Sequence, residues 1–559
     1  MKNSKNYFVL FIIINLFCAF NFTLVSQTKK DLLTPKVDSL FSQYNTPNSP
    51  GCAIGIMQDG KIIYEKGYGL ANLEYNIPIT PQTIFHMASV SKQFTAFAVV
   101  LLAQQGKISL DDDIRKYLPE VPDFGKKITI KNLIHHTSGL RDQWELLLIS
   151  GYRLDDVITT EHILKLISHQ KELNFSPGEM YMYCNTGYTL LAEIVKRVSG
   201  KSFDEFTRLN IFVPLRMINT HFHMDHEEIV KNRAYSYNTA GKNNFKNAVL
   251  SYANGGATSL FTNIDDMSKW INNFSDPVVG GKQAIDQMME RGILNNGTKI
   301  DYAFGLGLGA YRGLNRISHD GGDAGFRTNV TIFPDQKFAI IVFANVGDFN
   351  PGEYANKIAD IYLADKLTKD ATPGKPKEHK EVAINNTLYN QYTGTYQLFP
   401  GFTLTVTNEK NTLMVQATGQ KKFEVYPESE TNFFYKIVDA QITFDNPVNG
   451  KCSKLILHQN GSDMPGKKVD VVKPSIEELK EYEGNYYSDE LGTTINLVVI
   501  DSSLTFLDRR NPDLKLDSFG KDTFSAGPAV INFQRNNENK ICSLLVTTER
   551  VRNLKFSKI

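Results

Sequence analysis

A serine three residues before a lysine, at the start of a long apolar run, is the feature that most restricts what this chain can fold into. Ser89 and Lys92 have this spacing, and the run 94–102 that follows is apolar except for one threonine and is stopped by Gly106. Residues three apart lie on one face of a helix, so the hydroxyl and the amine are expected side by side. The same spacing also occurs at Ser26-Lys29, Ser168-Lys171 and Ser518-Lys521. Only Ser89 precedes such a run, which predicts a long apolar helix beginning near this serine.

The pairing of a hydroxyl with an amine indicates nucleophilic catalysis. A serine hydroxyl is a poor nucleophile at neutral pH, and it needs a neighbouring base and donors for the oxyanion that it creates. The start of a helix supplies N–H groups and partial positive charge around Ser89. Burial would lower the pKa of the Lys92 amine, so that it could act as the base or assist it. The alternative is that Ser89 is an ordinary helix N-cap and Lys92 a solvated lysine.

Two further motifs follow in order along the chain. Tyr183 and Asn185 stand just before an amphipathic stretch, and His319 opens a glycine-rich segment ahead of the strand-like run 329–333. This ordered triplet resembles the serine β-lactamase and penicillin-recognising superfamily, most closely its class C and D-aminopeptidase/esterase branch. The resemblance extends from about residue 40 to residue 366. Further segments that look like the family are 134–140, 254–256 and 304–307.

The resemblance implies a role for each of these residues. Ser89 would be the acylated nucleophile, and Tyr183 would share a proton shuttle with Lys92, with the choice of general base left open. The residues expected to bind substrate are Asn185, His319, Gly321 and Gly322. Asn185 would hydrogen-bond the substrate amide, and the backbone N–H groups of Gly322 and Ser89 would form the oxyanion hole.

His319 stands where most β-lactamases carry a lysine. A lysine offers a permanent cation to a substrate carboxylate, whereas a histidine with a pKa of about 6.5 is mostly neutral at neutral pH. Only a neighbouring acid such as Asp320 or Asp323 would raise that pKa. We therefore expect uncharged esters or amides to be better substrates than carboxylates. The alternative is that His319 is a strand-end residue without contact to substrate.

The sequence indicates neither a metal nor a cofactor. His221, His223 and His226 form the densest histidine cluster, but a metal site needs three or four convergent ligands with supporting partners, and this stretch is a polar connection. The four cysteines after the N-terminal segment are widely spaced, so neither a zinc knuckle nor a disulfide scaffold is indicated. A formal net charge of +1 gives no case for nucleic-acid binding.

The first 26 residues are typical of a secretory signal peptide. Lys2 and Lys5 precede an apolar run from Tyr7 to about Val25, and small and polar residues begin at Ser26. We expect cleavage near Ser26 and a periplasmic or secreted protein. The alternative is an uncleaved membrane anchor, because the run is long enough to span a bilayer, and contact with a membrane is expected only in that case.

The rest of the chain is expected to begin with an α+β domain of the β-lactamase/transpeptidase type over residues 30–367. A hairpin around the turn Asp59-Gly60 and two later strands within 327–344 predict one antiparallel sheet built from both ends of this domain. Helices inserted between these ends would flank the sheet, with the active site between the two parts. A polar, lysine-rich stretch with prolines predicts a linker over residues 368–384.

Short alternating strands dominate after the linker, and they repeat. Residues 392–396 parallel 482–486, and 442–453 parallel 531–543, with an offset of about 90 residues. The repeat predicts two copies of one small antiparallel β-barrel, over residues 385–472 and 474–559. Such paired barrels resemble those of the three-domain D-aminopeptidases. We expect both barrels to fold independently and to leave the nucleophile to the first domain.

These features together predict an exported serine hydrolase that acts through a Ser89 acyl-enzyme on amide, peptide or ester substrates. The substrate is expected to be a small molecule or a short, cell-wall-derived peptide. D-aminopeptidase-like or esterase-like activity is favoured over β-lactamase activity. The alternative from another class is a penicillin-recognising sensor or cell-wall binding protein that is acylated without turnover. Tyr183 and Asn185 argue against it, because deacylation needs a proton shuttle.

Overall fold

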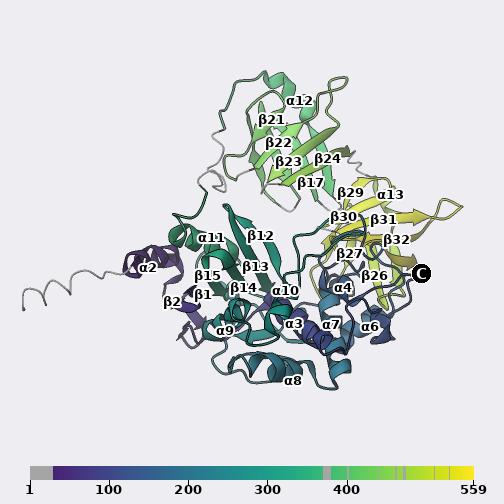
Figure 1. Cartoon of the computed structure of the whole chain (residues 1–559). Coiled ribbons are helices and arrows are strands. Elements are labelled where there is room, and N and C mark those ends of the chain that lie inside the picture. The colour runs from purple at the N-terminus through teal and green to yellow at the C-terminus, as the bar shows by residue number, and fades with distance from the viewer. Residues whose placement is uncertain are drawn as a thin grey trace, which may run out of the picture.

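The computed structural model describes residues 29–368, 379–399, 402–418, 420–438, 440–459, 462–469, 474–508, 510–527 and 529–559 (Figure 1). The predicted signal peptide, residues 1–26, and most of the predicted linker lie outside the described residues. Within the described ranges, no helix is both long and apolar enough to cross a bilayer.

A six-stranded antiparallel sheet forms the centre of the first domain, in the spatial order β12-β13-β14-β15-β1-β2. β1 pairs with β15, so that Ala53 lies opposite Phe343, and the two ends of the domain meet in the middle of the sheet. This arrangement confirms the predicted α+β fold. The strands are β1 (Cys52–Gln58), β2 (Lys61–Tyr68), β12 (Gly307–Tyr311), β13 (Leu314–Asp323), β14 (Phe326–Phe333) and β15 (Phe338–Ala344).

Helices cover both faces of this sheet. Alternate residues of β1 enter two different apolar clusters: Ile54 and Ile56 pack with α2 (Lys29–Leu40) and α11 (Pro351–Tyr362), whereas Ala53 packs toward α3 (Ser91–Gln104) and α9 (Ile264–Ser275). This period of two is the pleat of a strand that is buried on both sides. The continuous apolar sequence of β15 has the same cause, since all of its residues are buried.

The helical region inserted between β2 and β12 is organised around α3. Residues 91–102 of this helix are all buried, as the apolar run predicts. The surrounding helices are α4 (Ile130–Ile134), α5 (Gln143–Ile149), α6 (Thr160–Ser168), α7 (Asn185–Ser199), α8 (Phe203–Thr207) and α10 (Gly281–Met288). The short strands are β3 (Leu70–Asn72), β4 (Ile77–Pro78), β5 (Phe85–His86), β6 (Ile158–Thr159), β7 (His221–Phe222), β8 (Tyr237–Thr239), β9 (Phe245–Asn247), β10 (Tyr252–Ala253) and β11 (Leu260–Thr262).

Two nearly closed nine-stranded barrels follow, and their topology is the same (Figure 1). In each barrel the first strand pairs with the last, and the two strands at the ends of the sheet are not paired with each other. The first barrel has α12 (Tyr389–Tyr392), β16 (Gly394–Phe399), β17 (Phe402–Glu409), β18 (Thr412–Ala417), β19 (Lys422–Glu424), β20 (Tyr426–Pro427), β21 (Asn432–Phe434), β22 (Ala440–Phe444), β23 (Lys454–Gln459) and β24 (Ser462–Val469). The second has α13 (Ile476–Lys480), β25 (Gly484–Ser488), β26 (Thr493–Ile500), β27 (Ser503–Leu507), β28 (Leu514–Lys515), β29 (Asp517–Gly520), β30 (Thr523–Ala526), β31 (Ala529–Arg535), β32 (Ile541–Thr547) and β33 (Leu554–Lys558).

The repeated sequence motif marks the same corner in both barrels. The Tyr396 hydroxyl donates to the Tyr392 carbonyl at 2.8 Å, and the Tyr486 hydroxyl donates to the Tyr482 carbonyl at 2.8 Å. The glycine between each pair has a positive φ, +141° in one copy and +138° in the other, which a side chain would oppose. The predicted duplication is therefore a duplication of structure.

The two barrels differ in how they meet the first domain. The core of the first barrel is a separate apolar cluster, whereas the core of the second is continuous with that of the first domain. A buried ion pair joins Arg141 to Glu490, whose side chains are 1% and 6% exposed. Further ion pairs at the rim join Lys171 to Asp489 and Asp156 to Arg510. Among the described residues, the first barrel thus has a core of its own and the second shares one with the first domain, while independent folding of both barrels stays a prediction.

We expect Glu490→Gln to lower the free energy of unfolding by about 3–5 kcal/mol, because the buried Arg141 guanidinium loses its carboxylate. Asp489→Asn is the matched control, since its partner Lys171 is exposed and the loss should not exceed about 1 kcal/mol. Urea denaturation followed through the fluorescence of the two tryptophans, Trp144 in α5 and Trp270 in α9, measures both. Equal effects of the two substitutions would show that the Arg141–Glu490 pair does not fix the second barrel.

Candidate active site

Ser89 lies in a short 3-10 turn, Ala88–Val90, that leads into α3. Ala88 has a φ of +46°, in the left-handed region, and a residue held there costs about 1–3 kcal/mol. Strand β13 packs closely against this turn: a Cβ on Gly321 would lie 2.4 Å from the Met87 carbonyl oxygen. Gly321 therefore permits the close approach, and Ser89 stays partly exposed between buried neighbours.

The Lys92 amine is fully buried and its three hydrogens are all engaged. It donates to the Ser89 hydroxyl at 3.0 Å, to the Asn185 side-chain oxygen at 2.9 Å and to the Ala257 carbonyl at 2.8 Å. Burial lowers the pKa of Lys92 to about 7, against the attraction of Asp323 and Asp142. Near neutral pH, a large share of this amine is uncharged and able to accept a proton.

Tyr183 lies against Ser89 and Lys92. Its pKa is raised well above the usual value by burial, an effect that the hydrogen bond with Ser89 opposes. The Lys92 nitrogen lies 4.9 Å from the centre of the Tyr183 ring. Tyr183 therefore remains a phenol that can donate a proton, while Lys92 is the group that can accept one.

Asn185 is held by an aspartate that the sequence motifs do not mark. The Asp142 carboxylate is fully buried and accepts from the Asn185 backbone at 2.6 Å and from its side-chain amide at 2.9 Å. It also accepts from the Trp144 backbone, as the N-cap of α5. The amide orientation of Asn185 is thereby set, with its oxygen toward Lys92. An N-cap signal ahead of 143–149 marks Asp142 in the sequence, but the contact with Asn185 is not local.

His319 faces the site, but neither of its ring nitrogens is free to donate to a substrate. Nδ1 lies 2.6 Å from the Asp320 carbonyl, to which it donates, and the neutral Nε2 accepts from the Tyr302 hydroxyl at 3.0 Å. Burial, together with the charge of Lys92, lowers the pKa of His319 to about 4. A neutral His319, as expected from the sequence, is consistent with this lowered pKa. The sequence did not indicate its hydrogen bond with Tyr302.

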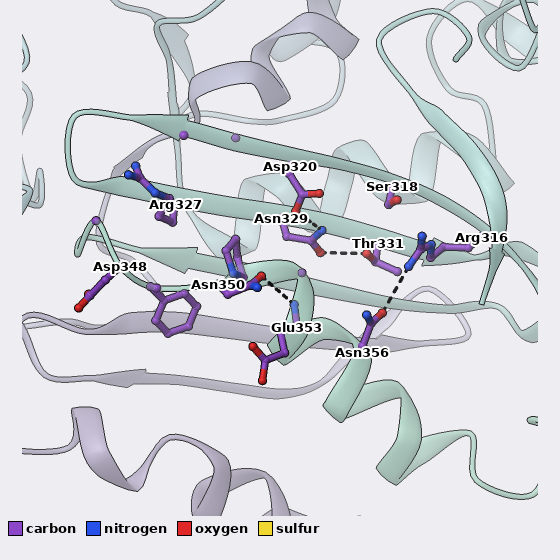
Figure 2. Close-up of a pocket in the computed structure, with 16 residues that line it drawn as sticks. Arg316, Ser318, Asp320, Arg327, Asn329, Thr331, Asp348, Asn350, Glu353 and Asn356 are labelled. Carbon is purple, nitrogen blue, oxygen red and sulfur yellow. Dashed lines mark hydrogen bonds between the residues drawn. The ribbon is translucent and has the colours of Figure 1, made fainter. Parts of the chain in front are cut away.

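The two acids that could have charged His319 are turned elsewhere. Neighbouring residues of a strand point to opposite faces, and the Asp320 side chain accepts from Asn329 at 2.9 Å on the far side of β13. Figure 2 shows that side, where a separate pocket of about 730 Å³ lies between these strands and α11. Asp323 meets His86 at 2.9 Å and also Thr258. Gly322 follows Gly321 in β13, the strand that packs against the Ser89 turn, and its share in an oxyanion hole stays a prediction.

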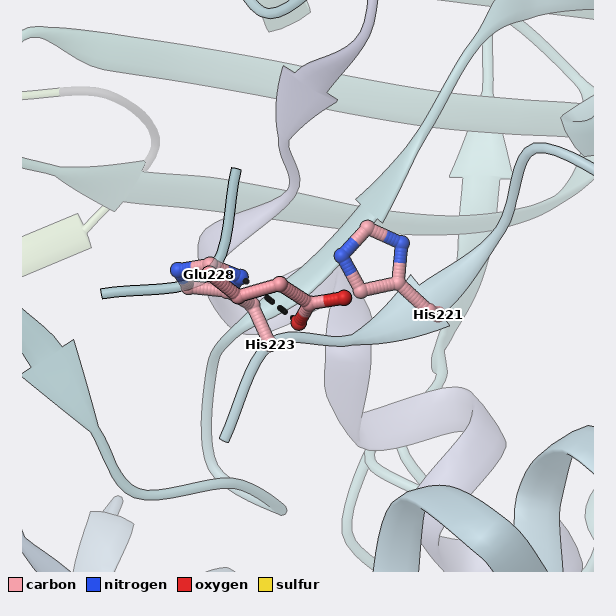
Figure 3. Close-up of side chains that lie close together, drawn as sticks. All are labelled: His221, His223 and Glu228. Atoms are coloured by element: carbon pink, nitrogen blue, oxygen red, sulfur yellow. Dashed lines mark ion pairs between the residues drawn. The ribbon is translucent and has the colours of Figure 1, made fainter. Parts of the chain in front are cut away.

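A histidine group lies apart from these contacts (Figure 3). His221, His223 and Glu228 place their possible ligand atoms within 4.8 Å of one another, and His226 does not belong to the group. Burial lowers the pKa of both histidines, and neutral imidazoles with a carboxylate are suitable zinc ligands. The positive charge of Arg233 acts on both histidines and opposes a cation there. We assign no metal to this group.

The second barrel contributes one side chain to the site. Arg550 lies in the turn between β32 and β33, and its Cζ is 5.2 Å from the centre of the Tyr183 ring. No motif marks this arginine, because the contact joins residues from opposite parts of the chain.

Comparison with known families agrees with this geometry. A profile of the β-lactamase family matches residues 37–364. A second profile, that of a domain of unknown function (DUF3471), matches residues 378–468, which include the first barrel.

Curated relatives are similar over different shares of their length. Penicillin-binding protein 4* of Bacillus subtilis is 28% identical over 421 residues, which cover 73% of this chain and 92% of that protein. A D-aminopeptidase of Gluconobacter oxydans is 27% identical over 300 residues, which cover 53% of this chain and 56% of that protein.

Solved structures share the fold. The octameric penicillin-binding protein homologue from Pyrococcus abyssi has a TM-score of 0.56 at 23% identity, covering 78% of this chain and 99% of that chain. D-amino acid amidase from Ochrobactrum anthropi SV3 has a TM-score of 0.51 at 20% identity, covering 60% of this chain and 99% of that chain.

We expect the rate of Ser89 modification by a fluorophosphonate to rise about tenfold per pH unit on the acid side and to level off above pH 7. The pKa of Lys92 is about 7, and only its uncharged form accepts the serine proton. His319→Asn is the control, because the His319 pKa is about 4 and its loss should leave the midpoint in place. Loss of the transition in that variant would assign the titrating group to His319 instead.

Proposed function

The chain belongs to the β-lactamase family of serine hydrolases, and we propose that it cleaves amide, peptide or ester substrates through an acyl-enzyme on Ser89. The observation that carries this proposal is the buried Lys92 amine, 3.0 Å from the Ser89 hydroxyl, with a pKa of about 7. A base of this strength next to a serine is what acyl transfer at neutral pH requires.

In the proposed mechanism, the neutral Lys92 amine takes the Ser89 proton as Oγ bonds to the substrate carbonyl carbon. Backbone N–H groups of Ser89 and Gly322 stabilise the oxyanion. The bond to the leaving group then breaks, and the proton passes from Lys92 through the Tyr183 phenol to that group. Water then attacks the acyl carbon as Lys92 takes one of the water protons. The bond between that carbon and Ser89 Oγ breaks, and Lys92 returns the proton to Oγ. Lys92 is preferred as the base because burial raises the pKa of Tyr183 well above its usual value, so that the phenol stays protonated.

Within this chemistry we favour a D-aminopeptidase-like or esterase-like hydrolase of the class C type, acting on a small molecule or a short, cell-wall-derived peptide. The D-aminopeptidase and the D-amino acid amidase among the similar proteins support this choice. The competing function is a sensor that is acylated without turnover, which the penicillin-binding relatives make worth testing. The intact set of Lys92, Tyr183 and Asn185 favours turnover.

Export is a separate part of the proposal and depends on residues 1–26. The lysines and the apolar run of this segment support a signal peptide that is removed near Ser26. The mass of the protein recovered from the periplasm or the medium tests this directly.

Ser89→Ala should abolish labelling by a fluorophosphonate and lower hydrolysis by about 10³-fold or more, because the nucleophile is lost. Ser168→Ala is the matched control, since Ser168 also stands three residues before a lysine but lies at the end of α6, where its hydroxyl donates to the Lys165 carbonyl at 2.8 Å. Intact mass and peptide mapping should give one adduct, in the peptide that contains Ser89. An adduct of unchanged yield in Ser89→Ala would refute the assignment.

Turnover distinguishes the hydrolase from the sensor. With p-nitrophenyl esters, D-aminoacyl anilides and a chromogenic cephalosporin, we expect product release to continue after the first equivalent on at least one ester or anilide. Release of a single equivalent from every substrate, with a stable adduct on Ser89, would support the sensor. Rapid-mixing absorbance with a known enzyme concentration measures the two phases.

A further inference from the structure

Arg550 is held over the candidate active site by its own backbone. Its carbonyl accepts from the Asp142 N–H at 3.3 Å and from the Asn174 side chain at 2.8 Å, and its N–H donates to the Glu145 carboxylate at 2.9 Å. The adjacent Arg552 N–H donates to Asn174 at 2.8 Å. The position of this turn of the second barrel is therefore set by the first domain and does not depend on the Arg550 side chain.

The Arg550 guanidinium, in contrast, makes few polar contacts with the described residues. In the part of the chain that the structure describes, its Nε is buried without a hydrogen-bond partner, and its ion pair is with Glu549 at 3.6 Å. Glu549 is 74% exposed, so this pair is weak. Asp142 and Glu145 attract the charge of Arg550, but both carboxylates accept hydrogen bonds from other groups. A guanidinium presents five donors in a planar fork, and most of this fork is unused.

The guanidinium lies beside the groups that surround Ser89. It lies over the ring of Tyr183, which is itself hydrogen-bonded to Ser89. Its charge also acts on Lys92, which places it within electrostatic range of the reacting groups. Lys92 itself has no free hydrogen, and His319 has no free N–H to offer.

We propose that Arg550 binds a carboxylate of the substrate, so that the second barrel completes the substrate site and the substrate class is anionic. A guanidinium fork matches the two oxygens of a carboxylate, and a desolvated pair of this kind is stronger than a neutral hydrogen bond. The inference rests on the proposed function of Ser89. It reverses the expectation, drawn from His319 alone, that uncharged substrates are preferred. A short peptide with a free carboxyl terminus has the required chemistry.

The test compares two esters of N-acetyl-D-alanine, one with glycolic acid, which carries a free carboxylate, and one with glycolamide, which is neutral and of the same size. The full-length protein should hydrolyse the glycolate ester with at least about tenfold higher kcat/KM. Arg550→Gln should lower kcat/KM for the glycolate ester by about 10- to 100-fold and for the glycolamide ester by less than about threefold. Arg550→Lys should fall between the two, because an ammonium keeps the charge without the fork.

Arg552→Gln is the matched control, since Arg552 lies in the same turn and meets the first domain through its backbone. It should keep the preference for the glycolate ester. Equal losses on both esters in Arg550→Gln would mean that Arg550 only positions Tyr183, and this would overturn the carboxylate site. A wild-type protein that Ser89 labelling shows to be active, but that does not prefer the glycolate ester, would also overturn it. Failure of Ser89 labelling in the wild type would instead refute the hydrolase itself.

Discussion

The buried amine of Lys92 is the interaction on which the rest of the site depends. Removing an ammonium from water costs several kcal/mol unless its hydrogens find acceptors, and here the acceptors come from three separate segments of the chain. They are the Ser89 turn, the first residue of α7 and the Ala257 carbonyl. The amine thus fixes these segments relative to one another. Its burial also lowers its pKa to about 7, so the proposed base has its pKa lowered by the same burial that organises the site.

The strained turn before α3 follows from the same arrangement. Ala88 keeps a positive φ because the residue before it is fixed by two hydrogen bonds: the Met87 N–H donates to the Leu260 carbonyl at 2.8 Å, and the Met87 carbonyl accepts from the Thr328 hydroxyl at 2.9 Å. Gly321 allows β13 to come this close. The sheet, built from both ends of the domain, therefore sets the direction of the Ser89 hydroxyl. A side chain at Gly321 would displace the turn and not only fill space.

Features carried by local spacing were predictable from the sequence, and those carried by distant contacts were not. The pair Ser89 and Lys92, the hairpin of β1 and β2, and the repeated tyrosine corner are all patterns within a few residues. Asp142, Tyr302 and Arg550 carry no such pattern, because each meets its partner only after the chain has folded. The two barrels look equivalent in sequence, yet the second shares an apolar core with the first domain and is joined to it by the buried pair of Arg141 and Glu490. His319 is neutral, as expected. The causes are its burial, which lowers its pKa, and the Tyr302 hydroxyl that its Nε2 accepts from, and neither could be seen in the composition.

Asp142 links the second barrel to the proton-transfer groups. Its backbone N–H donates to the Arg550 carbonyl, while its carboxylate holds Asn185, whose oxygen accepts from Lys92. A shift of the turn that carries Arg550 would therefore displace Asp142 first, and then the Asn185 amide that accepts from Lys92. The first domain carries Ser89, and the second barrel adds Arg550 beside Tyr183. Asp142 is buried and supports both Asn185, which contacts the Lys92 base, and the turn that carries Arg550. The position of the Arg550 charge and the proposed proton transfer at Lys92 therefore depend on the same residue.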